Sequence, residues 1–190
     1  HEKKINFNKK KKRFFFHNSI LNNIFLSKKL DKLVNLNEYN ESHVIEISNS
    51  RKEYFNKICN FIRNNYGIMI IIDYGYLAPI NYSTLQSVRF HRSTNILDNP
   101  GYQDITSLVN FNDLIEIAKK NYLNIYGPIT QQEFLKRNGI KERKKKILIK
   151  ASERQKLIIE KGYDRLIAQD QMGTAFKFLV VSTYRLSNEQ

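Results

Sequence analysis

The sequence predicts an α/β fold, and three observations lead to this prediction. A strand, a helix and a second strand follow one another with short joints between residues 43 and 72, which is the pattern of a βαβ unit. The second strand is an unbroken apolar run, typical of strands that are covered on both faces. Two later helices begin with the side-chain pattern of a capping box, at Thr130 and Ser152.

The first 42 residues are predicted to be a variable lead-in. Apolar and polar residues alternate before the basic run Lys9–Arg13, and apolar residues return after it, so we expect a short hairpin. From about residue 19 to residue 36 the pattern is mixed, helical or extended. The organised region is expected to be residues 43–190.

The βαβ unit is predicted from its apolar periodicities. The segment His43–Ser48 alternates like a strand, and the next segment places Phe55, Cys59 and Ile62 on one helical face before Gly67 ends the helix. The strand Ile68–Ile72 follows. Such a unit implies a parallel sheet with a right-handed crossover.

The apolar run stops abruptly at Asp73-Tyr74-Gly75. Ligands bind beyond the carboxyl ends of strands in α/β sheets, so these residues are candidates for a site. Aspartate and glycine are also common in ordinary turns, which leaves a purely structural role open.

Residues 78–104 are predicted to be a long surface excursion, because they contain two prolines and many polar residues. Polar side chains in such segments often build sites, although an exposed loop with unrelated charges is an equal alternative. The candidates are Arg89, His91, Arg92, Asp98, Asp104 and Thr106.

The remaining elements are predicted from local signals. A helix is expected over residues 112–121, and the Thr130–Glu133 capping box opens a helix that ends at Gly139. The Ser152–Gln155 pair opens the next helix in the same way. The last element, "AFKFLVVST", is predicted to be a strand.

Composition restricts the function classes. The net charge of +14 suggests nucleic acid, but Lys outnumbers Arg 22 to 10, and Lys, Asn and Ile exceed a third of the chain, as AT-rich codons would produce. The charge is therefore expected to be incidental, and nucleic acid is not an expected partner. The single cysteine forms no disulfide within the chain, and neither a signal peptide nor a membrane-spanning run is expected.

Several site motifs are missing from the sequence. The four histidines and Cys59 lack the close spacing of a zinc site, so no metal is expected. No G-x-S-x-G nucleophile motif occurs. No G-x-G-x-x-G occurs either, so these 190 residues offer no glycine-rich nucleotide cradle.

Six ordered blocks carry a resemblance to a known family. They are "IIDYG" from Ile71, "TLQSVRFH" from Thr84, "NPGYQDIT" from Asn99, "VNF" from Val109, "GPITQQEFLKRNGIKER" from Gly127 and "QMGTAFKFLVV" from Gln171. Together they resemble the carboxyl-terminal half of the MidA-like S-adenosylmethionine-dependent methyltransferases. That family includes the mitochondrial protein arginine methyltransferase that assists assembly of respiratory complex I.

The resemblance implies the later part of a Rossmann-like class I methyltransferase sheet with added helices. It also implies S-adenosylmethionine as cofactor and a protein substrate, such as a complex I subunit, in the bacterial cytoplasm or in the mitochondrial matrix of a eukaryote. The family's glycine-rich strand-turn and acidic second strand are not in this sequence. The chain is therefore expected to be a fragment, with no cofactor-binding residues of its own.

The resemblance places the strand Ile68–Ile72 as the fifth core strand, with Asp73 capping its end at the cleft. Carboxylates can localise the charge of a guanidinium and bind its fork geometry, so Asp73 and Asp104 are candidates, with His91 as proton acceptor or orienting group. Residues expected to line the cleft are Tyr74, Gly75, Arg89, Thr106, Gln131, Met172 and Gly173, with Phe176 packing beneath it. Two other hypotheses stay open: a non-catalytic scaffold or gene remnant, and a basic RNA-binding protein.

Overall fold

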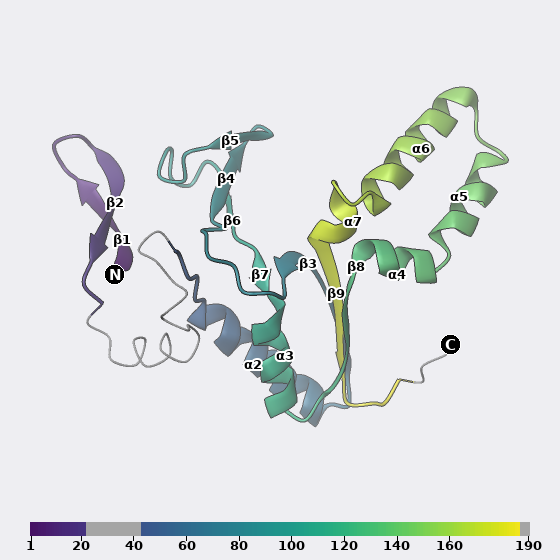
Figure 1. The fold of residues 1–190 in the computed structure, drawn as a ribbon, viewed down its shortest axis with the longest axis horizontal. Helices are drawn as coiled ribbons and strands as arrows, with labels where there is room; N and C mark the ends of the chain where they lie inside the picture. The colour runs from purple at the N-terminus through teal and green to yellow at the C-terminus, as the bar shows by residue number, and fades with distance from the viewer. Residues whose placement is uncertain (22–42, 187–190) are drawn as a thin grey trace. The chain divides into compact units, whose positions relative to one another are not determined.

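The computed structural model describes residues 1–21 and 43–186, and the chain forms two compact units (Figure 1). One unit comprises residues 1–46 and 80–107, and the other comprises residues 47–79 and 108–190. We call them the amino-terminal unit and the sheet unit. Each contains its own β-structure.

The sheet unit is built on a four-stranded sheet. In the spatial order β7-β3-β9-β8, its strands are Val109–Asn110, Ile68–Tyr76, Phe176–Ser182 and Asn124–Thr130. Strand β9 is antiparallel to both of its neighbours, and only β7 runs parallel to β3. The expected parallel sheet is therefore wrong, although the α/β class is confirmed.

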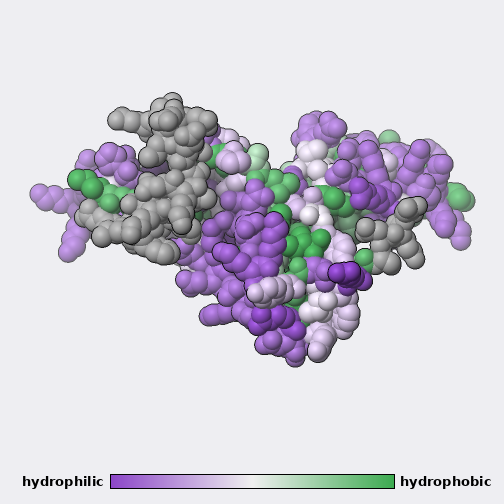
Figure 2. All heavy atoms as spheres, turned by 60° about the horizontal axis from the view of Figure 1, so that its bottom comes forward, coloured by the Kyte–Doolittle hydropathy of each residue, from purple (hydrophilic) through white to green (hydrophobic). Residues whose placement is uncertain are grey.

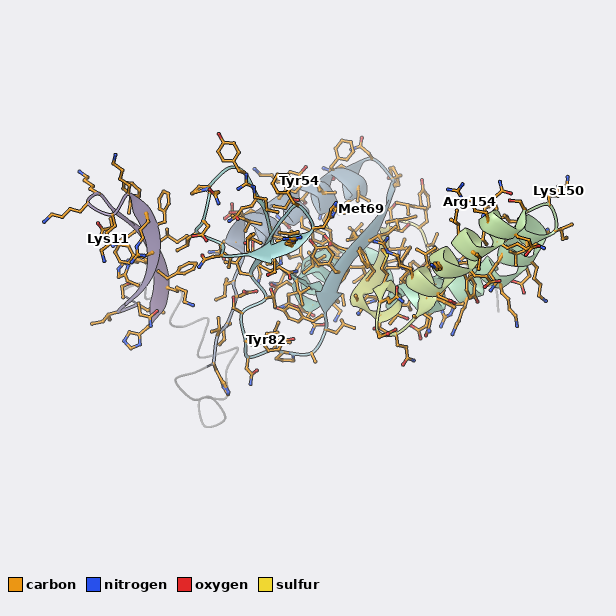
Figure 3. The ribbon with its side chains drawn as sticks, turned by 90° about the horizontal axis from the view of Figure 1, so that it is seen from above. Lys11, Tyr54, Met69, Tyr82, Lys150 and Arg154 are labelled. Carbon is orange, nitrogen blue, oxygen red and sulfur yellow. The ribbon has the colours of Figure 1, made fainter. Side chains whose placement is uncertain are left out.

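The core of the sheet unit lies between one face of the sheet and two helices, α2 (Asn49–Asn64) and α3 (Phe111–Lys120). The buried residues of this core are Phe55, Cys59, Ile62, Val109, Phe111, Leu114, Ala118, Leu123, Leu179 and Val181. Met69 and Ile71 of β3 pack against them, and Met69 is labelled beside α2 in Figure 3.

Burial in this core raises the pKa of the Cys59 thiol to about 11. That thiol is therefore a packing group, as its apolar surroundings require.

The opposite face of β3 is exposed, contrary to the prediction that both faces are covered. Side chains alternate along a strand, so Ile68, Ile70 and Ile72 all point away from the core. They are 50%, 58% and 52% exposed. Figure 2 shows apolar surface, in green, among hydrophilic regions. Only one face of the apolar run Ile68–Ile72 therefore packs against the core.

Four helices lie between β8 and β9 in the sequence: α4 (Gln131–Arg137), α5 (Ile140–Leu148), α6 (Glu153–Ile167) and α7 (Met172–Ala175). Both predicted capping boxes are confirmed, because the Thr130 and Ser152 hydroxyls accept hydrogen bonds from the backbone N–H groups of Glu133 and Gln155. The helix α3 and the strand β9 also agree with prediction. Strand β8 and helix α5 were not predicted.

The amino-terminal unit begins with the predicted hairpin, formed by β1 (Glu2–Asn8) and β2 (Arg13–Ser19). Lys11 lies at its turn (Figure 3), where its N–H donates to the Asn8 side chain at 2.9 Å. The segment predicted to be mixed helical or extended, residues 19–36, falls mostly outside the described residues.

Residues 43–48 form no strand, so this prediction is wrong. The Val44 N–H donates to the Asn81 carbonyl at 2.8 Å, and the Glu46 carboxylate binds residues 83–85. The Ser48 hydroxyl caps α2 by accepting from the Arg51 N–H. These contacts replace a strand ladder.

The excursion predicted for residues 78–104 contains most of a small sheet in the amino-terminal unit, which was not predicted. It has the order β5-β4-β6, with strands Arg92–Thr94, Gln86–Arg89 and Asp104–Thr106. Polar side chains hold it together, as Ser87 shows. Ser87 is only 1% exposed, and its hydroxyl donates a hydrogen bond to the Thr94 carbonyl at 2.9 Å. The strands of this sheet lack alternating apolar residues, so the sequence pattern did not predict them.

Candidate active site

Asp73 lies inside β3, because the strand continues to Tyr76. The expectation that Asp73 caps the end of the strand is wrong. Strand β7 extends the ladder by pairing with Gly75 and Tyr76. The Asp73 Oδ1 accepts a hydrogen bond from the Tyr74 N–H at 2.8 Å, and the side chain is partly exposed.

Lys177 lies directly opposite Asp73 on β9, and Thr130 lies opposite Lys177 on β8. Directly opposed residues share a face of the sheet, with Cβ atoms about 5 Å apart. Burial lowers the pKa of the Lys177 ammonium group, and its Nζ donates to the Thr174 carbonyl. The sheet therefore places a carboxylate, a partly desolvated amine and a hydroxyl in one row.

Lys177 was missed by the sequence analysis. It is the one charged residue in the apolar strand "FKFLVVS", which was an available signal. Its position opposite Asp73 depends on the register of two strands that are about a hundred residues apart in the sequence. Local pattern alone could not supply that pairing.

Tyr74 and Gly75 have clear packing roles. The Tyr74 ring meets the Phe176 ring edge to face, with centroids 5.5 Å apart. A Cβ at Gly75 would lie 2.2 Å from the Val109 carbonyl oxygen and 2.7 Å from the Phe111 ring. The glycine is therefore required by the close approach of β7 and α3 to β3.

Gln131, Met172 and Gly173 gather at the carboxyl end of α6. Gln131 is buried, and its Nε2 donates to the Leu166 carbonyl at 2.8 Å. A Cβ at Gly173 would lie 2.4 Å from the Ile167 carbonyl oxygen. These residues join α4, α6 and α7 beside the sheet end that carries Lys177, and their expected role in lining a cleft stays a prediction.

The other six candidates belong to the amino-terminal unit, and two of them, Arg92 and Asp98, are exposed. His91 lies at the tip of the β4–β5 hairpin, where Phe90 and His91 both have positive φ, 49° and 59°, as in a two-residue type I′ turn. The Arg89 guanidinium lies 5.1 Å from the Phe90 ring centroid. Asp104 and Thr106 share one face of β6, opposite Val88 and Gln86 of β4. All six side chains are at least partly exposed.

The Glu46 carboxylate organises the start of β4. Its oxygens accept hydrogen bonds from the Ser83 hydroxyl (2.9 Å), from the Thr84 N–H and hydroxyl (2.8 and 2.5 Å) and from the Leu85 N–H (3.2 Å). Burial alone would raise the pKa of the Glu46 carboxyl, but these hydrogen bonds outweigh it and hold the pKa below its ordinary value. Glu46 is thus ionised and structural, and the sequence analysis missed it.

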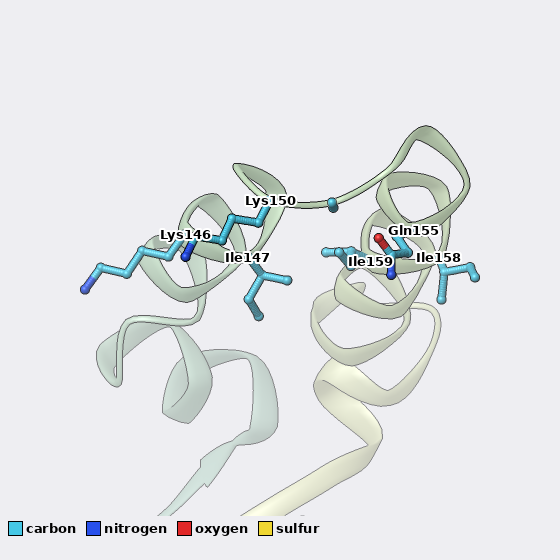
Figure 4. Close-up of a pocket in the computed structure, with 7 residues that line it drawn as sticks. Lys146, Ile147, Lys150, Gln155, Ile158 and Ile159 are labelled. Carbon is cyan, nitrogen blue, oxygen red and sulfur yellow. The ribbon is translucent and has the colours of Figure 1, made fainter.

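A groove of about 500 Å³ lies between α5 and α6, and its lining includes Lys146, Ile147, Lys150, Gln155, Ile158 and Ile159 (Figure 4). Lys150 and Arg154 mark the loop end of this helical hairpin in Figure 3. The groove contains none of the predicted site residues. In the described ranges, no cluster of three or more His, Cys, Asp or Glu residues could hold a metal ion, and no helix is long and apolar enough to cross a membrane.

Comparison with known proteins identifies what the chain resembles. Residues 2–129 match the model of a family described as "Putative S-adenosyl-L-methionine-dependent methyltransferase". The mitochondrial protein arginine methyltransferase NDUFAF7 of Xenopus tropicalis is 37% identical over 139 residues, and that of Xenopus laevis is 35% identical over 147 residues. These alignments cover 72% and 76% of this chain.

The fold also matches two solved structures from Burkholderia thailandensis. One, solved in native form, superimposes with a TM-score of 0.79, and the other, bound to S-adenosyl-homocysteine, with a TM-score of 0.77. Both are 21% identical, and the match covers 95% of this chain but 48% and 46% of theirs. The chain spans about a third of the length of the curated Xenopus relatives, 32% and 33%.

Proposed function

The chain belongs to this family of S-adenosyl-L-methionine-dependent methyltransferases, and we propose that it forms the carboxyl-terminal part of a protein arginine methyltransferase. Its curated relatives carry that activity in their names and are mitochondrial. The substrate we propose is an arginine of a protein, with a complex I subunit as the specific candidate. In a eukaryote, the mitochondrial matrix is the corresponding location.

The residues present do not form a cofactor site by themselves. A glycine-rich turn between a strand and a helix is the usual cradle for a nucleotide-like cofactor. In the described ranges, Gly75 is packed inside β3 and Gly173 against the end of α6, and neither opens toward a ligand. S-adenosylmethionine would supply the methyl group from a site completed by residues outside this chain.

Asp73 is the residue on which the proposed chemistry depends in the sheet unit. A guanidinium is a weak nucleophile while its charge is delocalised, and a carboxylate beside it orients the group and localises the charge. The Nζ of the neighbouring Lys177 donates to the Thr174 carbonyl, which leaves the Asp73 carboxylate able to bind an external cation. In the amino-terminal unit, taken by itself, Asp104 and His91 are proposed as a carboxylate and a proton acceptor.

The test is Asp73→Asn in a full-length protein that contains this chain. Asparagine keeps the side-chain oxygen that accepts from the Tyr74 N–H, so the melting temperature should stay unchanged. Methyl transfer to the protein substrate should fall by roughly 10–1,000-fold, on the order of 1.4–4 kcal/mol in the barrier. The matched control, Glu116→Gln at an exposed position of α3, should retain activity. Full activity in Asp73→Asn would remove Asp73 from the site.

A second candidate function, a non-catalytic scaffold, is favoured by the missing cofactor cradle. The two candidates share one expectation, that the 190 residues alone bind S-adenosylmethionine weakly or not at all. Titration calorimetry on the isolated chain measures this. Micromolar affinity would show that the cradle lies within these residues, and methyl transfer by the full-length protein would exclude the scaffold.

A further inference from the structure

The hairpin of helices α5 and α6 carries a groove that the proposed chemistry does not use. The groove has a volume of about 500 Å³. Ile147 of α5 and Ile159 of α6 point toward one another across it (Figure 4), and Ala151 and Ile158 add to its apolar lining. Ile147 and Ile158 are 44% and 62% exposed, so the apolar lining is open to solvent.

The lysines of this hairpin have two different roles. The Lys144 Nζ lies 2.6 Å from a Glu160 carboxylate oxygen and 4.0 Å from the Tyr163 ring centroid, so this lysine joins α5 to α6. Lys146 and Lys150 line the groove on its α5 side instead. In the described ranges, no carboxylate forms an ion pair with either of them. Their ammonium groups are therefore able to bind an external anion.

Positive charge is concentrated in this hairpin. Of the 28 residues from 140 to 167, ten are Lys or Arg and four are Asp or Glu, whereas the whole chain has 32 Lys or Arg in 190 residues. The hairpin thus has about twice the density of basic residues of the chain as a whole, which a codon bias acting on the entire gene does not explain. Electrostatic complementarity favours an acidic partner for such a surface.

We propose that the groove between α5 and α6 is a docking site for an acidic amphipathic helix of the protein substrate. The proposal rests on the proposed function, because a protein substrate is part of that function. Apolar side chains of the docked helix pack between Ile147 and Ile159, and its flanking carboxylates pair with Lys146 and Lys150. A helix fits better than a strand, because the backbone groups of α5 and α6 are already bonded within their own helices.

The groove is remote from the polar row on the sheet but firmly connected to that part of the fold. The Nε2 groups of Gln131 and Gln132, at the start of α4, donate to the last two carbonyls of α6 at 2.8 and 2.7 Å. From Ile158 to that end of α6 the helix rises by about 14 Å. Docking therefore holds the substrate without touching the reacting groups, and it should lower KM without changing kcat.

Other occupants fit the groove less well. Single-stranded RNA stacks its bases on aromatic rings, and none of the seven described residues that line the groove is aromatic. A membrane surface binds protruding apolar side chains, whereas Ile147 and Ile159 face each other between two helices. A second copy of the chain carries the same net charge of +14, which opposes association.

Fluorescence anisotropy with the 190-residue chain tests the binding directly. The probe is a labelled peptide of about five helical turns, with leucines along one face and glutamates along the other. It should bind at least roughly tenfold more tightly than a scrambled peptide of the same composition. Equal binding of the two peptides would show that charge alone attracts them and would overturn the proposal. Displacement of the probe by polyuridine RNA or by anionic vesicles, but not by the unlabelled peptide, would overturn it as well.

A pair of charge reversals locates the site. Lys146→Glu combined with Lys150→Glu should weaken peptide binding by roughly tenfold or more, because the new carboxylates repel the glutamates of the peptide. The matched control, Lys141→Glu with Lys161→Glu, makes the same change in net charge at two exposed positions of the hairpin outside the groove lining. It should retain most of the affinity. Equal losses in the two double variants, with circular dichroism unchanged, would contradict docking in the groove.

Kinetics of a full-length protein that contains this chain test the link to the substrate. The groove variant should raise KM for the protein substrate by roughly tenfold, leave kcat unchanged, and leave methyl transfer to a short arginine peptide unchanged. An unchanged KM, or a full-length protein that does not bind the probe, would overturn the docking role. A full-length protein without methyl transfer would refute the proposed function, whereas the peptide affinities would still decide whether the groove binds an acidic helix.

Discussion

The two units of the molecule are held together in different ways. Among the described residues, every buried apolar side chain belongs to the sheet unit, with Phe111, Leu179 and Val181 fully enclosed. The buried residues of the amino-terminal unit are polar, Thr84 and Ser87. Apolar packing is non-directional and insensitive to pH, whereas hydrogen bonds to an ionised group depend on geometry and on protonation. The two units should therefore respond differently to mutation and to acid.

Truncation of the apolar core should have the largest effect. Leu179 is fully buried opposite Ile71, so Leu179→Ala should lower the free energy of unfolding of the sheet unit by about 2–5 kcal/mol, through lost burial and a cavity. Urea denaturation followed by far-UV circular dichroism measures it.

The control for that prediction is Ile70→Ala on the neighbouring strand. Ile70 is 58% exposed, so its truncation should change the stability by less than about 0.5 kcal/mol. Equal losses for the two variants would mean that both faces of the sheet are packed in solution.

This contrast explains how much of the fold could be predicted. The capping boxes at Thr130 and Ser152 and the helical face of α2 are local signals, and they gave correct elements. Strand β8 was missed because Gly127-Pro128 signals a turn, although the strand continues through a bulge there. Strands β4–β6 were missed because polar side chains, without apolar alternation, stabilise them.

The candidate site was predictable only in part, because local sequence signals do not show which distant segments pair. Asp73 stood out because it interrupts an apolar run, which is visible in a few residues of sequence. Lys177 and Glu46 depend on pairings between distant segments, Asp73 with Lys177 and Glu46 with residues 83–85. The apolar run Ile68–Ile72 predicted a strand with two covered faces, whereas only one face of β3 is covered in the described residues.

Acid should weaken the amino-terminal unit first. The folded-state pKa of Glu46 is below its ordinary value of 4.5, so the unfolded chain takes up the proton at higher pH than the folded chain. The stabilisation by Glu46 is therefore complete above pH 4.5 and is lost as the pH falls through the lower, folded-state pKa. Amide exchange of β4–β6, measured as a function of pH, should show this loss while β9 remains protected.

Glu46→Gln should remove that pH dependence. At neutral pH it should cost roughly 1–2 kcal/mol of local stability, because the charge-assisted hydrogen bonds are lost from a group that is still partly solvated. A variant with the same acid sensitivity as the parent would show that another group controls the unit.

The smallest effect should come from the polar interior of the three-stranded sheet. The Ser87 hydroxyl donates to the Thr94 carbonyl and lies 3.0 Å from the Thr94 Oγ1, which donates to Gln103. Ser87→Ala keeps the size of the side chain nearly constant and removes one link of this chain, so the unit should lose about 1 kcal/mol. Ser93→Ala, at an exposed position of β5, is the matched control and should lose nothing measurable. Exchange rates of the β4–β6 amides compare the two. If both variants behaved alike, the buried hydrogen bonds would not stabilise the sheet, and its few apolar contacts would have to hold it.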